Sequence, residues 1–122
     1  QNLKIDNFSI LPGSELKLLS GLEQGCTGII TATCNVTAKL SRKVYDDFIE
    51  KKKQSQNEKL CNVRKVFDQF DLISGLHSFL MNKNKMYENI LPPLSLLNSN
   101  DRKKLFEDLK KLNFNMKKTK VV

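Results

Sequence analysis

The sequence contains no tryptophan, one histidine and only three cysteines, and each scarcity argues against a class of function. Without Trp, and without aromatic residues interleaved among its basic ones, the chain lacks the stacking surface of single-stranded nucleic-acid binders. One histidine, His77, cannot build a Ser/His/Asp triad without partners, and no group of Cys, His and acidic residues has the spacing of a metal site. We therefore predict no metal and no triad chemistry.

The cysteines and the N-terminal residues bear on the cellular compartment. Cys26, Cys34 and Cys61 are odd in number and show no C-x-x-C spacing, which indicates reduced thiols of a cytoplasmic protein. Residues 1–13 hold neither the basic nor the apolar region of a signal sequence. No apolar run reaches the length of a membrane span, so we predict no membrane association.

The net charge of +8 could suggest an acidic partner such as nucleic acid. Lysine outnumbers arginine by 18 to three, and the lysines are spread over the polar faces of the predicted helices and the C-terminal tail. A nucleic-acid interface gathers its basic residues on one face instead. We expect no nucleic-acid partner.

The first third of the chain has the pattern of a βαβ unit. An extended run at about 8–12 ends at Pro12-Gly13, and an amphipathic helix at about 14–25, capped by Ser14, ends at Gly25. A β-branched apolar run follows at about 28–34. Such a nearly continuous apolar strand is typical of a parallel sheet covered on both faces, so the predicted fold class is α/β.

The remainder of the chain has a helical pattern. We expect a helix at about 37–53, and a second at about 58–74 that Gly75 breaks before a short continuation. Asn98, with Asp101 three residues later, has the pattern of an N-cap for a last helix. Two strands and about five helices make the chain rich in helix for an α/β protein.

Two stretches, in order along the chain, carry a family resemblance. The first is the turn Gly13-Ser14-Glu15, its helix, and the run Gly28–Val36 with the sequence G-I-I-T-A-T-C-N-V. The second is Leu91-Pro92-Pro93-Leu94 followed by Asn98-Ser99-Asn100-Asp101-Arg102. They resemble the seventh strand, seventh helix, eighth strand and last helix of the dihydrodipicolinate synthase / N-acetylneuraminate lyase family of Schiff-base class I aldolases. The resemblance covers nearly all of the chain.

This resemblance implies a (β/α)8 TIM barrel, of which the chain would be the C-terminal fragment, because a complete barrel takes about 250 residues. Residues 1–53 would hold the last two strands, at about 8–12 and 28–34, with helices at about 14–25 and 37–53. Residues 54–122 would form a helical C-terminal extension with a basic tail. The family also implies a homo-oligomer, usually a tetramer, for the full-length protein.

The implied activity is that of a carbon–carbon lyase or synthase similar to 4-hydroxy-tetrahydrodipicolinate synthase. Family members hold pyruvate or a related 2-keto acid on a lysine as a Schiff base, move protons with a tyrosine hydroxyl, and need no cofactor or metal. Both groups belong to strands upstream of this chain, so no catalytic residue is expected here and the fragment alone should be inactive. Lys4 is interpreted as a surface lysine, and Tyr45 and Tyr87 as packing residues.

The resemblance assigns four substrate-binding residues. Gly13 would let the backbone approach the keto acid, Glu15 would point toward the variable part of the substrate, and Ile30 would contact the pyruvate moiety through its backbone. Ala32 stands where sialic-acid-cleaving members carry a serine, and Leu16 where they carry a second acid, which argues against sialic acid as substrate. Structural alternatives exist, since Glu15 is also a favourable first-turn acid and Ile30 also suits a barrel core.

Two other functions stay open on this sequence. The chain could be a small, helical, basic binding module whose βαβ start is misinterpreted. It could also be a family member that keeps the barrel but has lost catalysis and serves as a scaffold or regulator. An independently stable 122-residue fold would favour the binding module, whereas a barrel fragment should expose sheet edges.

Overall fold

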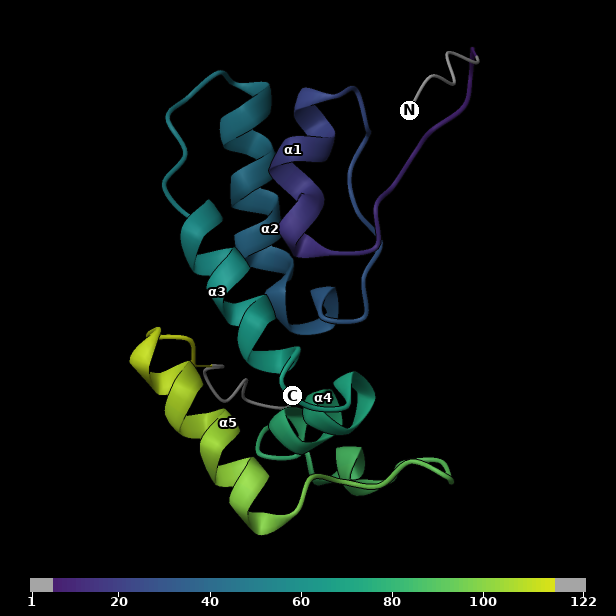
Figure 1. Cartoon of the computed structure of the whole chain (residues 1–122), viewed down its shortest axis with the longest axis vertical. Coiled ribbons are helices and arrows are strands. Elements are labelled where there is room, and N and C mark those ends of the chain that lie inside the picture. The colour runs from purple at the N-terminus through teal and green to yellow at the C-terminus, as the bar shows by residue number, and fades with distance from the viewer. Residues whose placement is uncertain (1–5, 116–122) are drawn as a thin grey trace.

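The computed structural model describes residues 6–115, which form helices joined by extended segments (Figure 1). Along the chain these are η1 Glu15–Lys17, α1 Leu18–Glu23, α2 Cys34–Ile49, α3 Asn57–Phe67, α4 Leu72–Leu80, η2 Lys85–Glu88 and α5 Ser99–Lys111, where η marks a 3₁₀ helix. Helices α1, α2 and α3 lie side by side, and α3 leads to α4 and α5 at the other end of the molecule. Helix α3 is therefore the element that the two ends share.

Two hydrophobic clusters meet on α3. The first joins α1, α2 and the start of α3 through Leu18, Leu22, Val44 and Leu60. The second joins the rest of α3 to α4, α5 and Leu97, through Val63, Val66, Phe67, Leu76, Phe79, Leu97, Leu105 and Leu109. Apolar residues three or four positions apart lie on one face of a helix, and this spacing lets α3 contribute to both clusters.

The two predicted strands, at about 8–12 and 28–34, are not present as strands in the part of the chain that the structure describes. The two segments do run side by side in the same direction. The amide of Thr27 donates to the carbonyl of Ile10 at 3.1 Å, and the amide of Ile30 donates to the carbonyl of Pro12 at 3.2 Å. A parallel ladder needs evenly spaced bonds, and a pair of strands without neighbours is marginal, so these two contacts do not make a sheet.

The second segment is also shorter than predicted, because its last residues turn into a helix. The amide of Asn35 donates to the carbonyl of Ala32, and the amides of Val36 and Thr37 donate to the carbonyl of Thr33. Helix α2 therefore begins at Cys34, three residues before the predicted start, and ends at Ile49 rather than near residue 53.

Three predicted helix boundaries are confirmed. The Ser14 hydroxyl accepts a hydrogen bond from the amide of Leu16 at 3.2 Å, at the start of η1. Gly25 adopts a φ of 94° just after α1, where a residue with a Cβ would be strained. The Asn98 side chain accepts from the amide of Asp101 at 2.8 Å and caps α5.

The predicted helix at about 58–74 is wrong in one respect, because it is two helices and Gly75 does not break them. The chain turns between Phe67 and Leu72, and Gly75 lies inside α4. Asp71 caps α4 by accepting from the amide of Ser74 at 2.9 Å and from its hydroxyl at 2.8 Å. A Cβ at Gly75 would lie 3.5 Å from a ring carbon of Phe67, so the glycine sits where α4 packs on the end of α3.

The cap at Asp71 makes the stability of α4 dependent on pH. Hydrogen bonds from Ser74 lower the pKa of Asp71 below its ordinary value of 3.8. A carboxylate with a depressed folded pKa stabilises the fold above the unfolded value, and this contribution is lost as pH falls through the folded pKa. We expect Asp71→Ala to lower Tm at neutral pH, and the difference from the parent to shrink in acid well below 3.8.

Thermal unfolding followed by circular dichroism, at neutral pH and at a pH well below 3.8, measures this difference in Tm. Asp71→Asn is the matched control, because asparagine is an equally good N-cap and has no charge to lose. It should keep most of the neutral-pH Tm. An Asp71→Ala variant whose Tm deficit is equally large at both pH values would contradict the assignment.

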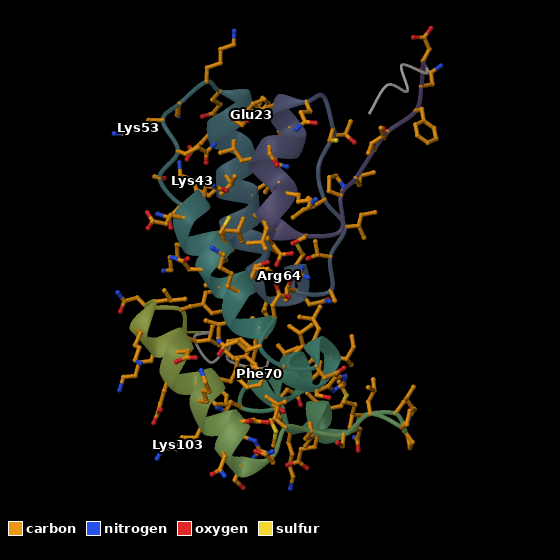
Figure 2. All side chains as sticks on the ribbon, in the orientation of Figure 1. Glu23, Lys43, Lys53, Arg64, Phe70 and Lys103 are labelled. Atoms are coloured by element: carbon orange, nitrogen blue, oxygen red, sulfur yellow. The ribbon has the colours of Figure 1, made fainter. Side chains whose placement is uncertain are left out.

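Most lysines among the described residues lie on the outside of the helices. Lys53 and Lys103 project away from the ribbon, whereas Arg64 lies at its centre (Figure 2). Several lysines pair with acids one turn away, as in Lys43–Asp47 at 2.7 Å and Lys104–Asp108 at 2.8 Å. Positive charge is thus distributed and partly neutralised. Between residues 6 and 115, no helix combines the length and apolar character that crossing a membrane requires.

Candidate functional site

The two extended segments bring Gly13 and Ile30 together. Pro12 and Ile30 share a backbone hydrogen bond, and a Cβ added to Gly13 would lie 3.9 Å from the Ile30 carbonyl oxygen. That separation is an ordinary van der Waals contact, so the chain itself does not require glycine at position 13. The backbones of Gly13 and Ile30 are thus adjacent, so both could contact one substrate. Their role in substrate binding stays a prediction.

The same segments expose large apolar side chains. The side chain of Ile30 is 72% exposed, that of Phe8 59% and that of Leu11 42%. Large apolar side chains gathered on neighbouring segments are typical of a surface that another element covers. Ile30 therefore does not pack into a core within the described residues.

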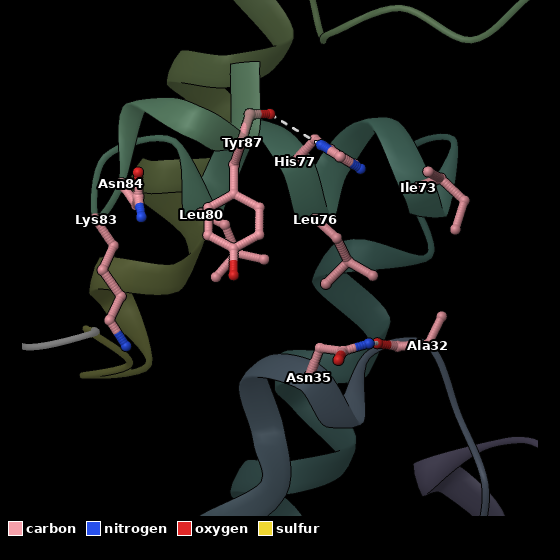
Figure 3. Close-up of a pocket in the computed structure, with 9 residues that line it drawn as sticks. All are labelled: Ala32, Asn35, Ile73, Leu76, His77, Leu80, Lys83, Asn84 and Tyr87. Atoms are coloured by element: carbon pink, nitrogen blue, oxygen red, sulfur yellow. Dashed lines mark hydrogen bonds between the residues drawn. The ribbon is translucent and has the colours of Figure 1, made fainter. Parts of the chain in front are cut away.

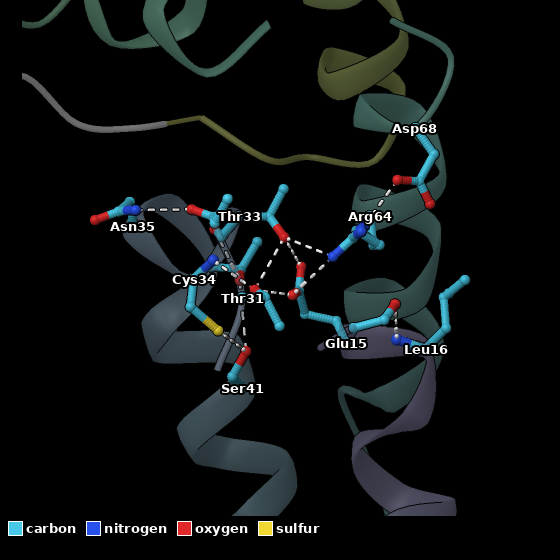
Figure 4. A network of polar contacts seen from close by, with 12 residues as sticks. Glu15, Leu16, Thr31, Thr33, Cys34, Asn35, Ser41, Arg64 and Asp68 are labelled. Carbon is cyan, nitrogen blue, oxygen red and sulfur yellow. Dashed lines mark hydrogen bonds and ion pairs between the residues drawn. The ribbon is translucent and has the colours of Figure 1, made fainter. Parts of the chain in front are cut away.

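Glu15 is the centre of a buried polar network (Figure 4). Its carboxylate is fully buried, and it accepts hydrogen bonds from the hydroxyls of Thr31 and Thr33. Thr31 in turn accepts from the amide of Cys34 at 3.0 Å, at the start of α2. The network thus ties η1 to the segment that precedes α2.

The cation of this network is Arg64 on α3. Its Nη1 atom donates to a carboxylate oxygen of Glu15 at 3.3 Å and to the hydroxyl of Thr33 at 3.2 Å, while its Nε atom donates to Asp68 at 2.8 Å. Burial alone would lower the pKa of the Arg64 guanidinium, but the hydrogen bond to Asp68 and the charge of Glu15 raise it above its ordinary value. Arg64 is therefore firmly held as a cation between two acids.

This arrangement bears on the predicted role of Glu15. Glu15 is not a solvated first-turn acid, because its side chain is fully buried. Its oxygens already have partners from three other residues, so a substrate group that met Glu15 would join an existing network. Sequence patterns do not predict Arg64 as a partner, because it lies 49 positions away from Glu15 and has no local signal. The alternating Thr31 and Thr33 are the one signal in the sequence, since two hydroxyls on one side of an otherwise apolar strand need a polar partner.

Ala32 lies apart from Glu15 and lines a cavity between α4, η2 and the start of α2 (Figure 3). The cavity has a volume of about 390 Å³. Its apolar wall consists of Ala32, Ile73, Leu76 and Leu80. The four predicted substrate-binding residues therefore lie in three places. Gly13 and Ile30 are adjacent, Glu15 lies in the buried polar network, and Ala32 lines the cavity.

His77 shapes this cavity. Its Nδ1 atom lies 2.9 Å from the carbonyl oxygen of Tyr87. A carbonyl can only accept, so Nδ1 carries the proton and the ring fastens η2 to α4. The two rings also meet edge to face, with centroids 6.3 Å apart. His77 is thus a packing residue between α4 and η2.

Two further predictions concern Cys34 and metal binding among residues 6–115. Cys34 is the first residue of α2 rather than the end of a strand, and its Sγ atom lies 3.6 Å from the hydroxyl of Ser41. Within this range no group of three or more His, Cys, Asp or Glu side chains could hold a metal ion. Lys4 lies outside the described residues.

Comparison with known proteins bears directly on the predicted family. The model of the dihydrodipicolinate synthetase family matches residues 2–112. Among solved structures, the crystal structure of a dihydrodipicolinate synthase from Bacillus anthracis is similar to this chain, with a TM-score of 0.77 and 18% sequence identity. The likeness shows a shared fold and covers 87% of this chain but 37% of that one. No curated protein matches the chain.

Proposed function

This chain belongs to the dihydrodipicolinate synthetase family, and from that membership we propose that it is part of a lyase or synthase that forms a Schiff base with pyruvate or a related 2-keto acid. The observation that carries the proposal is the family match over residues 2–112. The chain spans well under half the length of the Bacillus anthracis enzyme, so it would supply one part of a (β/α)8 barrel. The full-length protein would be a homo-oligomer, usually a tetramer in this family.

The exposed apolar side chains of the two extended segments support the barrel. Phe8, Leu11 and Ile30 are exposed here and would be covered by the rest of a barrel, and the segments already run parallel, as barrel strands do. Active sites of such barrels lie at the C-terminal ends of the strands. Gly13 and Ala32 follow the two segments in the chain direction, so both would face the same end.

The chemistry divides between this chain and the rest of the barrel. A lysine amine upstream attacks the ketone carbon of the 2-keto acid, and loss of water leaves a protonated imine. The imine accepts the electron pair of the carbon–carbon bond that breaks, or stabilises the carbanion equivalent that adds to an aldehyde. In this proposal Gly13 and Ile30 hold the keto acid through backbone atoms, and Glu15 with Arg64 sets the polarity beside the substrate tail.

Borohydride trapping of pyruvate on the longer protein tests this function. Reduction converts the imine to a stable secondary amine, and mass spectrometry of a proteolytic digest then identifies the modified lysine. We expect one adduct per chain of the longer protein, on a lysine in a strand that comes before the segment containing Phe8. The isolated 122-residue chain, treated identically, should give no adduct.

The controls separate the possible outcomes. Omitting borohydride should leave the lysine unmodified, because the imine hydrolyses. An adduct on a lysine within residues 6–115 would overturn the assignment of the nucleophile to the upstream strands. A folded longer protein that gives no adduct would refute the enzyme proposal.

A family member without catalysis is the second candidate, and the Glu15–Arg64 pair favours it. The carboxylate that the resemblance assigns to the substrate is fully buried and bound by residues of its own chain. A protein that has lost its substrate could keep such a network for stability alone. The trapping experiment distinguishes the two, since only the enzyme gives an adduct.

A further inference from the structure

The cavity beside α4 has the chemistry of a ligand site as well as its size. Its volume of about 390 Å³ suits a small organic molecule. One wall is apolar, with Leu76 and Leu80 from α4 and Ala32 from the opposite side. The other residues that face it carry amide, hydroxyl, imidazole and ammonium groups. An apolar wall with a few converging polar groups is typical of ligand pockets.

The charged side chain that lines the cavity is positive. Lys83 lines the cavity and is half-buried, yet within residues 6–115 it forms no ion pair. None of the residues that line the cavity is an Asp or a Glu. Asn35 lies in the first turn of α2, so the positive end of that helix dipole adds to the field. A negative charge bound here would meet attraction without a competing carboxylate.

Polar groups gather on one side of the cavity. In Figure 3 the Tyr87 hydroxyl and the Lys83 ammonium point to the side of the cavity where Asn35 lies. The hydrogen bond from His77 to the carbonyl of Tyr87 holds that tyrosine in place against α4. Lys83 and Tyr87 therefore offer donors to an anionic group on this side, and Leu76 and Leu80 offer an apolar surface for the body of a ligand.

We propose that this cavity binds a small monocarboxylate with an apolar body. One ammonium matches one negative charge, whereas a phosphate dianion would need further cations, and Arg residues do not line the cavity. The apolar wall favours a hydrocarbon or aromatic body over a polyhydroxylated one. The site uses described residues alone and does not depend on the Schiff-base lysine of the proposed function.

Titration of the 15N-labelled chain with benzoate tests the proposal, with benzyl alcohol as the neutral probe of similar shape. We expect saturable shifts at the backbone amides of Asn35, Lys83 and Tyr87, and about tenfold weaker binding of benzyl alcohol, as loss of a charge-assisted hydrogen bond implies. Lys83→Gln should weaken benzoate about tenfold and leave benzyl alcohol unchanged. Tyr87→Phe should weaken benzoate several-fold.

Lys110→Gln is the matched control, because Lys110 is an exposed lysine on α5 away from the cavity. It should bind benzoate as the parent does. An equal loss of benzoate affinity in Lys83→Gln and Lys110→Gln would mean that the overall charge of the chain attracts benzoate. That result would refute the proposed site. Absence of saturable shifts in a folded chain, or shifts confined to residues away from the cavity, would also overturn the proposal. None of these outcomes bears on borohydride trapping, so the two proposals fail separately.

Discussion

Replacement of Arg64 by methionine is expected to destabilise the chain by about 3–5 kcal/mol, because it leaves a buried carboxylate without its cation. Glu15 is fully buried, the Arg64 side chain is 12% exposed, and their charged atoms lie 3.3 Å apart. Methionine keeps much of the apolar stem but donates no hydrogen bond. Domains of this kind have unfolding free energies of about 5–15 kcal/mol, so the loss would be a large share of the total.

Arg42→Met is the matched control for this variant. Arg42 pairs with Asp46 at 3.0 Å on the surface of α2, and its side chain is 70% exposed. Exposed pairs contribute about 0–1 kcal/mol, so this variant should unfold at nearly the parental urea concentration. Urea titration followed by circular dichroism measures both. Equal losses of unfolding free energy in the two variants would show that the buried Glu15–Arg64 pair stabilises the fold no more than an exposed pair does.

A double variant isolates the charge effect from the loss of packing. Glu15→Gln in the Arg64→Met background removes the unpaired charge. The amide oxygen can still accept from one of the two threonine hydroxyls, and the amide nitrogen can donate to the other hydroxyl once it rotates. We expect it to recover a substantial part of the lost unfolding free energy, which makes the two substitutions strongly non-additive. A double variant less stable than Arg64→Met alone would contradict the explanation.

Phe79→Ala is expected to have a comparable effect, about 3–5 kcal/mol, through a different mechanism. Phe79 is 5% exposed and contacts three other rings. Its centroid lies 5.7 Å from that of Phe67, 5.8 Å from that of Phe106 and 5.7 Å from that of Phe114. Truncation leaves a cavity between α3, α4 and α5, where rigid helices cannot close fully.

Phe8→Ala provides the matched control, because it removes the same atoms from a side chain that is 59% exposed. It should cost under about 1 kcal/mol, as surface substitutions usually do. The same urea titrations compare the two variants. If both lost the same unfolding free energy, the aromatic cluster would not be the core of this end of the molecule.

The sequence was most informative where a structure depends on neighbouring residues. The caps at Ser14 and Asn98 were predicted correctly because donor and acceptor are two or three residues apart. Gly25 was predicted to end a helix for a similar reason, since a positive φ depends on that residue's own lack of a Cβ. The family resemblance was also correct, as the match over residues 2–112 confirms.

The sequence misled where local patterns conflict with packing. Gly75 reads as a helix breaker, yet it lies within α4, which begins at the Asp71 cap and packs on Phe67. Asp71 carries the correct signal, because an aspartate three residues before Ser74 is placed to cap a helix that begins at Leu72. The run at 28–34 reads as a strand, but a strand also needs a regular ladder of bonds to a neighbour. Within residues 6–115 the neighbouring segment gives this run one backbone bond, from Ile30 to Pro12, and a second bond at Thr27 just before it.

The sequence by itself therefore determined the family, the helical segments and several of their ends. Only the tertiary structure decided that Glu15 pairs with Arg64 and that Ala32 meets Lys83 and Tyr87 around one cavity. Hydrogen bonds within a turn depend on residues a few positions apart, so their pattern is visible in the sequence. Contacts between residues 49 positions apart depend on how α3 crosses the earlier segments, and no local pattern encodes that crossing.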